Sequence, residues 1–329
     1  MGVTIKDIAR ATGYSANTVS RALSERGEIS EATSSYIKEV AEKMGYIHNS
    51  IASSLRAGKT NTIAVIIGSI FNSHFSILIK EIEEEASKGD YTVLILNTNE
   101  DEASERKAIK TAIGKNVDGI IMCPVQSSTE NIKLLKSSGI PFVLIGRHFD
   151  DMDTDYVVCD DYRGGKCAAE YLLEKGKQRI YFIIPDTYTS SQEERSAGFR
   201  DAFMERRGEF RDEQIILKKA DEQLVDCFEH NSASLLGADA IMCFSDEMAH
   251  ALIYWLRSHG KVIPGDIDII GFDDIQSRIS MPIRVKSVKS YKSLMSHTAY
   301  EILTERIGDP AAPRKHVVIS TELSEGETA

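Results

Sequence analysis

The first sixty residues carry the hydrophobic pattern of short amphipathic helices. Small and apolar residues recur three and four positions apart, which places them on one face of a helix. Gly13-Tyr14-Ser15 interrupts this pattern, a second helix follows the break, and a third begins near Ser30 and ends at Gly45. Two short helices joined by a three-residue turn, with a third helix completing the core, are typical of a helix-turn-helix. The buried face of the first helix is defined by Ile5, Ile8, Ala9 and Thr12.

From Thr62 onward the period changes, and apolar runs alternate with amphipathic helical stretches. Continuous runs of Val, Ile and Leu predict parallel strands that are covered on both faces. These units are too many for one sheet, so we expect two doubly wound lobes with a ligand cleft beyond the carboxyl ends of their strands. The predicted strands are 63–67, 93–96, 119–122, 142–145, 180–184, 240–244 and 267–272, and the predicted helices include 75–87, 103–115, 130–137 and 247–258.

The length and composition fit such a chain. With 329 residues, two or three domains are expected, and 42% hydrophobic with 27% charged residues permits a sizeable core. The net charge of −11, taken over the whole chain, argues against binding to nucleic acid, which is also negatively charged. However, residues 1–60 carry 8 basic against 6 acidic residues, whereas the rest carries 31 against 44. This small excess of basic residues does not establish DNA binding. It suggests that, if the protein binds DNA, only the N-terminal segment of residues 1–60 contacts the phosphates.

Signals for an enzyme, a metal centre or a disulfide scaffold are poor. The five cysteines are scattered without C-x-x-C spacing, and no G-x-G-x-x-G, Walker, H-E-x-x-H or G-x-S-x-G motif is present. No apolar run approaches the roughly 20 residues of a membrane span, and Lys6, Asp7 and Arg10 lie where a secretion signal needs its apolar stretch. We therefore expect a cytoplasmic protein that is not an enzyme and has no cofactor, metal or membrane partner.

The second helix carries the sharpest chemical signal. Asn17 and Arg21 share its exposed face, from which a side chain can enter the major groove of DNA. Arginine can form two hydrogen bonds to guanine, and asparagine can do so to adenine. The alternative is a three-helix satellite domain whose polar face is only solvated.

Two sets of motifs extend this interpretation to almost the whole chain. The head contains Val3-Thr4-Ile5-Lys6-Asp7-Ile8-Ala9, Gly13-Tyr14-Ser15 and Thr18-Val19-Ser20-Arg21-Ala22-Leu23. The body contains Glu194-Arg195-Ser196-Ala197-Gly198-Phe199, Ser245-Asp246, Pro264-Gly265-Asp266-Ile267, Gly271-Phe272-Asp273-Asp274 and a final Thr321-Glu322-Leu323. Together these motifs resemble the lactose-repressor (LacI/GalR) family of bacterial transcription regulators, and Thr321–Leu323 fits the last strand of that family.

The resemblance implies roles for residues of the head. It places Ala16, Asn17 and Arg21 on the recognition helix, facing bases. A family hinge helix that orders on operator DNA corresponds to residues from about Asn49 to Ala57, including Ala52, and the leucine that it wedges into the minor groove corresponds to Leu55. The positions that match phosphate contacts are Thr4, Ser15, Ser20, Ser30 and Thr33.

In the body, the resemblance singles out Arg195 and Asp273 as ligands of a small-molecule effector. A guanidinium fork and a carboxylate suit vicinal hydroxyls or a ring carboxylate. The alternative is a structural Arg–Asp pair between the lobes. Weaker candidates are Arg147 and three aromatic residues that could stack on a ring or belong to the core, namely Phe71, Phe75 and Phe244.

The expected fold is α plus α/β, with a three-helix helix-turn-helix headpiece and hinge helix before a two-lobed body that resembles periplasmic binding proteins. The expected function is a ligand-responsive DNA-binding regulator, a repressor of a carbohydrate-utilisation operon, that acts as a homodimer on a near-palindromic operator. The effector would be a sugar or sugar phosphate, and a phosphocarrier protein stays open as a partner. The alternative is a two-lobed solute-binding protein without a DNA role. The expected divisions are 1–48 for the headpiece, 49–60 for the hinge, and 61–329 for the body, with lobe one at 61–160 and 288–310 and lobe two at 161–285 and 314–324.

Overall fold

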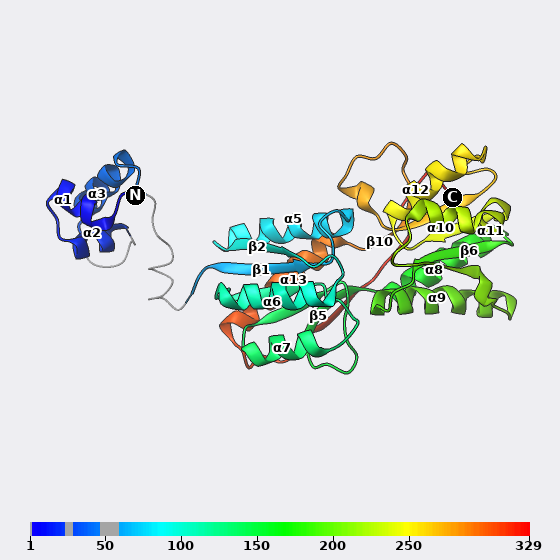
Figure 1. The fold of residues 1–329 in the computed structure, drawn as a ribbon, viewed down its shortest axis with the longest axis horizontal. Coiled ribbons are helices and arrows are strands. Elements are labelled where there is room, and N and C mark those ends of the chain that lie inside the picture. The colour runs from blue at the N-terminus through cyan, green and yellow to red at the C-terminus, as the bar shows by residue number, and fades with distance from the viewer. Residues whose placement is uncertain (1, 24–28, 47–58) are drawn as a thin grey trace. The chain divides into compact units, whose positions relative to one another are not determined.

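The structure is a computed structural model that describes residues 2–23, 29–46 and 59–329. Its contacts divide the chain into two compact units, Met1–Thr60 and Asn61–Ala329 (Figure 1). The predicted hinge helix, with Asn49, Ala52 and Leu55, lies outside the described residues. Within the described ranges, no helix has the length and apolar character needed to cross a membrane.

The first unit is a bundle of three helices, α1 (Ile5–Thr12), α2 (Ala16–Leu23) and α3 (Glu31–Lys43). Each helix begins after a hydroxyl residue that accepts a backbone N–H of the first turn, which satisfies a donor that would otherwise have no partner. The left-handed conformation of Gly13, at φ 75°, ends α1 and makes the turn to α2. The small core contains Ile8, Val19, Ala22, Ile37 and Ala41.

Lobe one of the second unit is built on a six-stranded parallel sheet in the order β11-β5-β4-β3-β1-β2. Helices α5 (Ser73–Lys88) and α13 (Lys292–Gly308) cover one face, and α6 (Glu102–Gly114) and α7 (Glu130–Ser138) cover the other. The strands are β1 (Thr62–Ile67), β2 (Thr92–Asn97), β3 (Gly119–Met122), β4 (Phe142–Ile145), β5 (Asp155–Cys159) and β11 (His316–Ile319).

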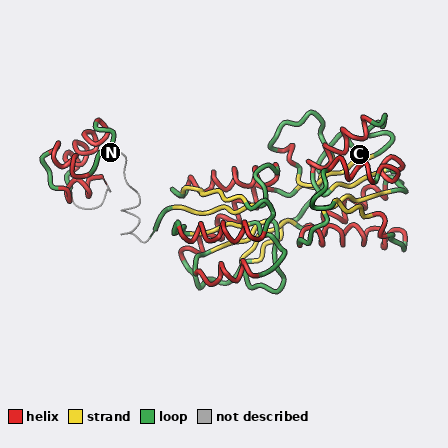
Figure 2. Tube along the Cα trace, viewed as in Figure 1, coloured by secondary structure: helices red, strands yellow, loops and turns green. Residues whose placement is uncertain are grey.

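Lobe two has a five-stranded parallel sheet in the order β10-β9-β8-β6-β7. Figure 2 shows the strands of this lobe flanked by helices. The strands are β6 (Ile180–Pro185), β7 (Ile215–Lys218), β8 (Ala240–Cys243), β9 (Asp268–Asp273) and β10 (Lys286–Lys289). One face is covered by α8 (Asp161–Glu174) and α9 (Ser190–Arg207), and the other by α10 (Leu224–His230), α11 (Ser232–Gly237) and α12 (Asp246–Ser258). Short 3₁₀ turns occupy Asp212–Gln214 and Ile275–Ser277.

The predicted lobe boundaries near the C-terminus are wrong. Residues 314–324 were assigned to lobe two, but β11 pairs with β5 in the sheet of lobe one. Residues from 288 were assigned to lobe one, but β10 extends to Lys289 in the sheet of lobe two. The predicted last strand, Thr321–Leu323, is reduced to one antiparallel bridge between Leu323 and Val288. Strand pairing between distant segments is not a local property, so periodicity alone could not place these segments.

Helices α8 and α9 of lobe two pack closely through two glycines. A Cβ on Gly198 would lie 2.0 Å from the carbonyl oxygen of Tyr162, and one on Gly165 would lie 2.1 Å from that of Arg195. Only residues without a side chain permit this approach between the two backbones. The packing fixes the position of Arg195, in the second turn of α9, beside Asp161 at the start of α8.

We predict that Gly198→Ala destabilises the protein by about 1–3 kcal/mol, because the added methyl group must push two backbones apart. Gly114→Ala is the matched control, since Gly114 is also helical and its Cβ would meet no atom within 4 Å. This change should be neutral or stabilise by up to about 1 kcal/mol. Urea unfolding of both full-length variants measures the difference. A Gly198→Ala protein as stable as the control would contradict the close packing.

Candidate functional site

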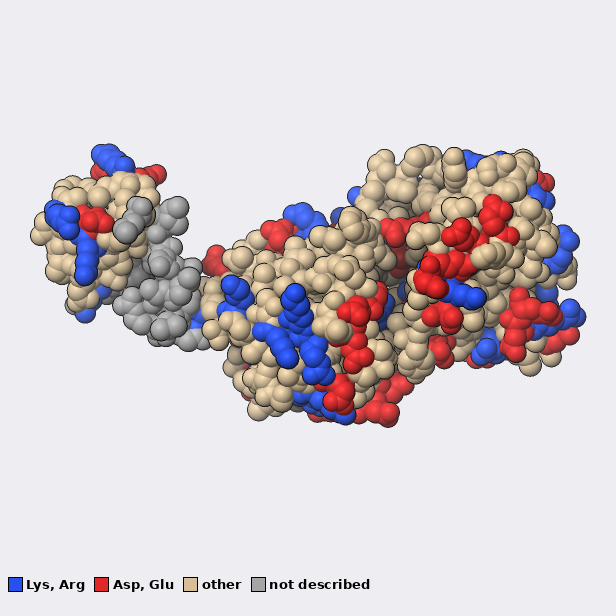
Figure 3. All heavy atoms as spheres, viewed as in Figure 1, with Lys and Arg blue, Asp and Glu red and all other residues tan. Residues whose placement is uncertain are grey.

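The exposed face of α2 presents the residues predicted to read bases. Ala16, Asn17 and Arg21 are exposed, while Val19 and Ala22 on the opposite side of the helix are buried in the core of the head. The polar face of α2 is therefore exposed to solvent, and the apolar face packs into the core. Figure 3 shows both basic and acidic side chains on the visible faces of the headpiece and of the body.

Three of the predicted phosphate contacts are helix caps. The Oγ1 of Thr4 accepts the N–H of Asp7 at 3.4 Å, and the Oγ of Ser15 accepts the N–H of Thr18 at 3.1 Å. The Oγ of Ser30 accepts the N–H of Thr33, whose own hydroxyl lies 2.9 Å away. The start of a helix carries partial positive charge and suits an anion. Ser20 instead lies along α2 and is half-buried.

A cavity of about 660 Å³ lies between the two lobes of the body. Its walls come from the loops that follow the carboxyl ends of strands in both sheets, where ligands bind in open α/β folds. Five predicted effector residues line this cavity: Phe75, Arg147, Arg195, Phe244 and Asp273.

The predicted role of Phe71 is not supported. Its side chain is 92% exposed and does not line the cavity. The loop after β1 is held by a hydrogen bond from the N–H of Ile70 to the Oδ1 of Asn97, and this loop turns Phe71 to solvent. That position 71 is a phenylalanine did not indicate whether the loop after β1 would turn its side chain toward the cavity or toward solvent.

Arg195 is part of a buried framework at the wall of the cavity. Its Nε donates to Asp161 Oδ1 at 2.6 Å, and its NH1 group donates to the carbonyl oxygen of Phe244 at 2.7 Å. The guanidinium carbon lies 4.4 Å from the ring centroid of Phe244 and 3.4 Å from that of Phe272. Burial raises the pKa of Asp161, although the adjacent Arg195 opposes this shift. The ion-pair partner of Arg195 is thus Asp161, not Asp273.

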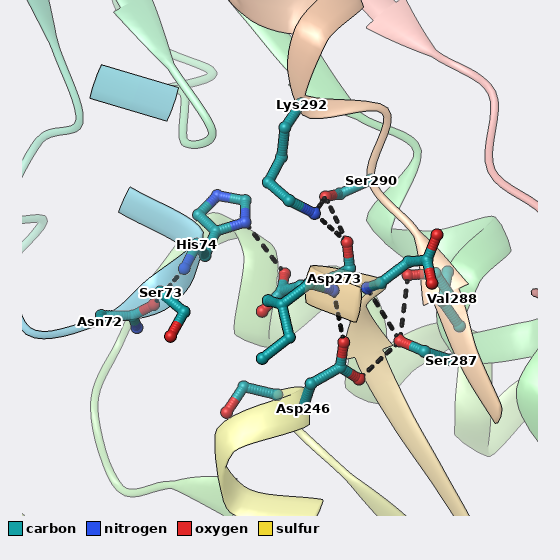
Figure 4. Close-up of polar contacts among 12 residues, drawn as sticks. Asn72, Ser73, His74, Asp246, Asp273, Ser287, Val288, Ser290 and Lys292 are labelled. Carbon is teal, nitrogen blue, oxygen red and sulfur yellow. Dashed lines mark hydrogen bonds and ion pairs between the residues drawn. The ribbon is translucent and has the colours of Figure 1, made fainter. Parts of the chain in front are cut away.

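Asp273 ends β9 and is buried where several elements meet (Figure 4). Its Oδ1 lies 3.2 Å from the Nδ1 of His74, which belongs to α5 of lobe one. Its backbone oxygen accepts from the Nζ of Lys292 and from the Oγ of Ser290. Burial would raise the pKa of Asp273, but His74, Arg195 and Lys292 outweigh it, and the net shift is downward. An ionised carboxylate therefore faces the cavity.

A second buried carboxyl, Asp246, lies behind this site at the start of α12. Its carboxylate accepts a hydrogen bond from the hydroxyl of Ser287 at 2.6 Å and one from the backbone N–H of Ile275 at 2.8 Å. Burial raises its pKa to about 8, with a further contribution from Asp273. Ile275 lies just after β9, and Ser287 of the neighbouring strand β10 accepts the N–H of Asp274, so Asp246 supports the position of Asp273 through both contacts.

Arg147 lies in the loop after β4 and lines the lobe-one side of the cavity. Its two terminal nitrogens donate to the carboxylate of Glu100 at 2.7 and 3.0 Å, and one also donates to the carbonyl oxygen of Pro124 at 2.9 Å. The two parallel hydrogen bonds between Arg147 and Glu100 fix the orientation of both side chains, so this pair forms a planar, polar part of the cavity wall.

Sequence reasoning missed several residues that join the lobes around the cavity. Glu247 Oε1 of lobe two accepts the N–H and Oγ of Ser73 in lobe one, at 2.8 and 2.9 Å. The Oε1 of Gln126 in lobe one accepts the N–H of Ser190 at 2.8 Å. Ser73, Gln126 and His74 all follow strand ends of lobe one, and that position was the only local signal for them.

Comparison with protein families gives two matches. Residues 4–49 match the model of the bacterial regulatory proteins of the lacI family. Residues 169–329 match a periplasmic binding protein-like domain. The first match covers all three helices of the head, and nothing in the comparisons supports a solute-binding protein without a DNA role.

Individual relatives agree with these matches. The chain is 35% identical over 283 residues to the HTH-type transcriptional regulator DegA of Bacillus subtilis, covering 83% of this chain and 82% of that protein. It is 28% identical over 329 residues to the HTH-type transcriptional repressor PurR of Aliivibrio fischeri, covering 97% and 96%. A solved LacI family regulator from Enterococcus faecalis, with bound ribose, is 26% identical with a TM-score of 0.70, covering 82% of this chain and 98% of that one.

The head has the exposed reading helix of a helix-turn-helix, the body has two parallel α/β lobes with a cavity between them, and the relatives over most of the chain are transcription regulators. The chain therefore belongs to the LacI family of bacterial regulatory proteins and is a DNA-binding transcription regulator.

Proposed function

We propose that this regulator is a repressor whose α2 reads the major groove of an operator. Asn17 and Arg21 would contact base edges beside Ala16, while the caps at Thr4, Ser15 and Ser30, together with Ser20 and Thr33, would hold phosphates. The exposed polar face of α2 supports this assignment. Asn49, Ala52 and Leu55 would form the minor-groove hinge, with Leu55 as the wedge.

We propose a homodimer on a near-palindromic operator. One headpiece offers a single short recognition helix, and a twofold pair of such helices reads two half-sites. A phosphocarrier protein as an additional partner is implied by the family resemblance alone. No step in the proposal requires catalysis.

We propose further that the cavity between the lobes binds a sugar or sugar phosphate. The observation that carries this proposal is the arrangement of Arg195, Asp273 and the Arg147–Glu100 pair around one cavity of about 660 Å³. Fixed charged groups can accept from and donate to vicinal hydroxyls, and the rings of Phe75 and Phe244 add apolar area. The bound ribose of the Enterococcus faecalis relative supports the same ligand class. A carbohydrate-utilisation operon would be the target.

Ligand binding would act on DNA through the lobes. A ligand that binds one arrangement of the lobes better than another shifts the population toward it, and the hinge segments would transmit that shift to the heads. Such coupling is reciprocal, so operator DNA must change ligand affinity by the same factor. A thermal-shift screen of the full-length protein with sugars, sugar phosphates and purines tests the ligand class. Stabilisation by purines alone would contradict it.

We predict that Arg21→Ala weakens specific operator binding by about 1–3 kcal/mol and relaxes the preference at one base pair of each half-site. Arg10→Ala is the matched control, because Arg10 is exposed on α1 and its removal changes the charge equally. The control should lose only salt-dependent affinity, without altered base preference. Fluorescence titrations with operator and single-base variants measure both. Equal specificity in the Arg21→Ala protein and the wild type would contradict this role.

We predict that Arg195→Lys keeps the protein folded but weakens ligand binding by about 1–3 kcal/mol. Lysine keeps a positive charge beside Asp161 and loses the planar fork, whereas alanine would leave that buried carboxylate without its partner. Arg163→Lys is the control, since Arg163 lies on the same lobe, exposed and 3.5 Å from Glu170. Calorimetry with ribose or the best sugar from the screen measures affinity. Wild-type affinity in Arg195→Lys would refute the assignment.

A further inference from the structure

The charged side chains around the cavity are balanced in sign. Arg195 has a partner behind the cavity wall, the buried carboxylate of Asp161. With Asp161 counted, four carboxylates lie against three cations and His74, so the described part of the wall carries no excess of positive charge. The basic residues that line the cavity are Arg147, Arg195 and Lys218, and the acidic ones are Glu100, Glu247 and Asp273.

The pair of Arg147 and Glu100 offers hydrogen-bond donors and acceptors side by side. Arg147 donates twice to the Glu100 carboxylate and once to the carbonyl oxygen of Pro124. These bonds use three of the five N–H groups of a guanidinium, and the other two have no partner among the described residues. Each carboxylate oxygen also keeps a lone pair after accepting one bond. The pair can therefore still bind a ligand through both of its members.

The local backbone is built to hold Glu100 against Arg147. Asn99 and Glu100 both have left-handed conformations, with φ of 55° and 56°, which residues with a side chain rarely adopt. The Oγ1 of the buried Thr98 accepts the N–H of Glu100 at 3.3 Å. Gly68, directly after β1, leaves room for the carboxylate, because a Cβ there would lie 2.0 Å from Glu100 Oε1. The position of Glu100 is thus determined by two loops of lobe one.

Such a pair discriminates between a sugar and its phosphate ester. A hydroxyl both donates and accepts, so neighbouring hydroxyls of a sugar can bridge a guanidinium and a carboxylate. A phosphate group carries a charge of about −1.5 to −2 near pH 7, and its oxygens act as acceptors. Beside Arg147 a phosphate would meet the fixed negative charge of Glu100, and like charges in contact are strongly unfavourable.

The remaining charges of the wall give a phosphate little compensation. Lys218, at the end of the edge strand β7, is half-buried, and its Nζ donates to the carbonyl oxygen of Lys219 at 2.9 Å. Against this one amine stand Glu247 and Asp273, whose carboxylates form no salt bridge with an arginine or lysine in the part of the chain that the structure describes. An anionic group would therefore be repelled from this side of the cavity as well.

We propose that the effector is an uncharged sugar, and that Glu100, by neutralising Arg147, makes the cavity reject the phosphate ester of the same sugar. This inference rests on the proposed sugar class and narrows it. Glu100 acts as a specificity-determining residue: its charge excludes the ester, and its free lone pairs accept from the hydroxyls of the sugar.

Calorimetric titration of the full-length protein tests the proposal. Each sugar of the screen is compared with its own phosphate ester, for example ribose and glucose with theirs, at about pH 7.5 and constant ionic strength, where the ester is close to dianionic. At least one free sugar should bind, and its ester should bind at least about tenfold more weakly. An ester that binds as tightly as its free sugar, or more tightly, would overturn this inference and leave the sugar class standing. Binding of neither form in any pair would overturn the sugar class itself, and this inference with it.

Variants of Glu100 show whether its charge sets the preference. Glu100→Gln keeps the shape and removes the charge, so the ratio of ester affinity to sugar affinity should rise at least about tenfold. Glu100→Asp keeps the charge and should retain the preference for the free sugar, which a purely structural role would not explain. The matched control is Glu130→Gln, since Glu130 pairs with Lys133 at 2.8 Å on the same lobe and does not line the cavity. The same ratio in Glu100→Gln and in this control would contradict the role of Glu100.

A second variant reaches the same contact without changing any charge. Gly68→Ala places a methyl group where the Glu100 carboxylate lies and pushes this flexible side chain away from Arg147. The ester-to-sugar ratio should then rise in the same direction as in Glu100→Gln, by a smaller factor. This variant replaces Glu100→Gln if that protein fails to fold, and an unchanged ratio in Gly68→Ala would then contradict the proposal.

Discussion

The charge of Asp273 is the constraint around which the two lobes are arranged. A buried carboxylate without partners would cost several kcal/mol. Here His74 of lobe one contacts the carboxylate directly, and the positive charges of Arg195 and Lys292 lie near enough to favour its ionised form. Lys292, at the start of α13, also donates to the backbone oxygen of Asp273. The backbone at Asp273 has a φ of 105°, a conformation that non-glycine residues rarely adopt, and the hydrogen bonds to its carbonyl oxygen hold it there. Asp273 therefore joins the two lobes and contributes a negative charge to the wall of the cavity.

This arrangement gives a physical basis for regulation. The head is a compact unit with its own small core and an exposed polar face on α2. The body has two lobes that share polar contacts around a cavity. Polar contacts of this kind are exchanged for water or ligand at small net cost, which makes the arrangement of the lobes responsive to what fills the cavity.

Much of the fold could be predicted from the sequence because it depends on local periodicity. The three helices of the head and the central strands of both sheets lie close to their predicted ranges. The strand β11 was assigned to the wrong lobe because its pairing with β5 joins distant parts of the chain. For the site, Arg195 and Asp273 were identified by family resemblance, whereas their partners Asp161 and His74 were not. Those partners depend on the glycine-mediated approach of α8 to α9 and on the contact between the two lobes, which no local pattern records.

The central claim is that a small molecule between the lobes changes the affinity of the heads for DNA. The most direct measurement is the affinity of the full-length protein for a site selected from random duplexes, taken with the cavity empty and with it saturated by the sugar found in the screen. The account predicts two different affinities, and it predicts that adding the DNA changes the sugar affinity by the same factor. An unchanged affinity for the selected site when the cavity is saturated would contradict it.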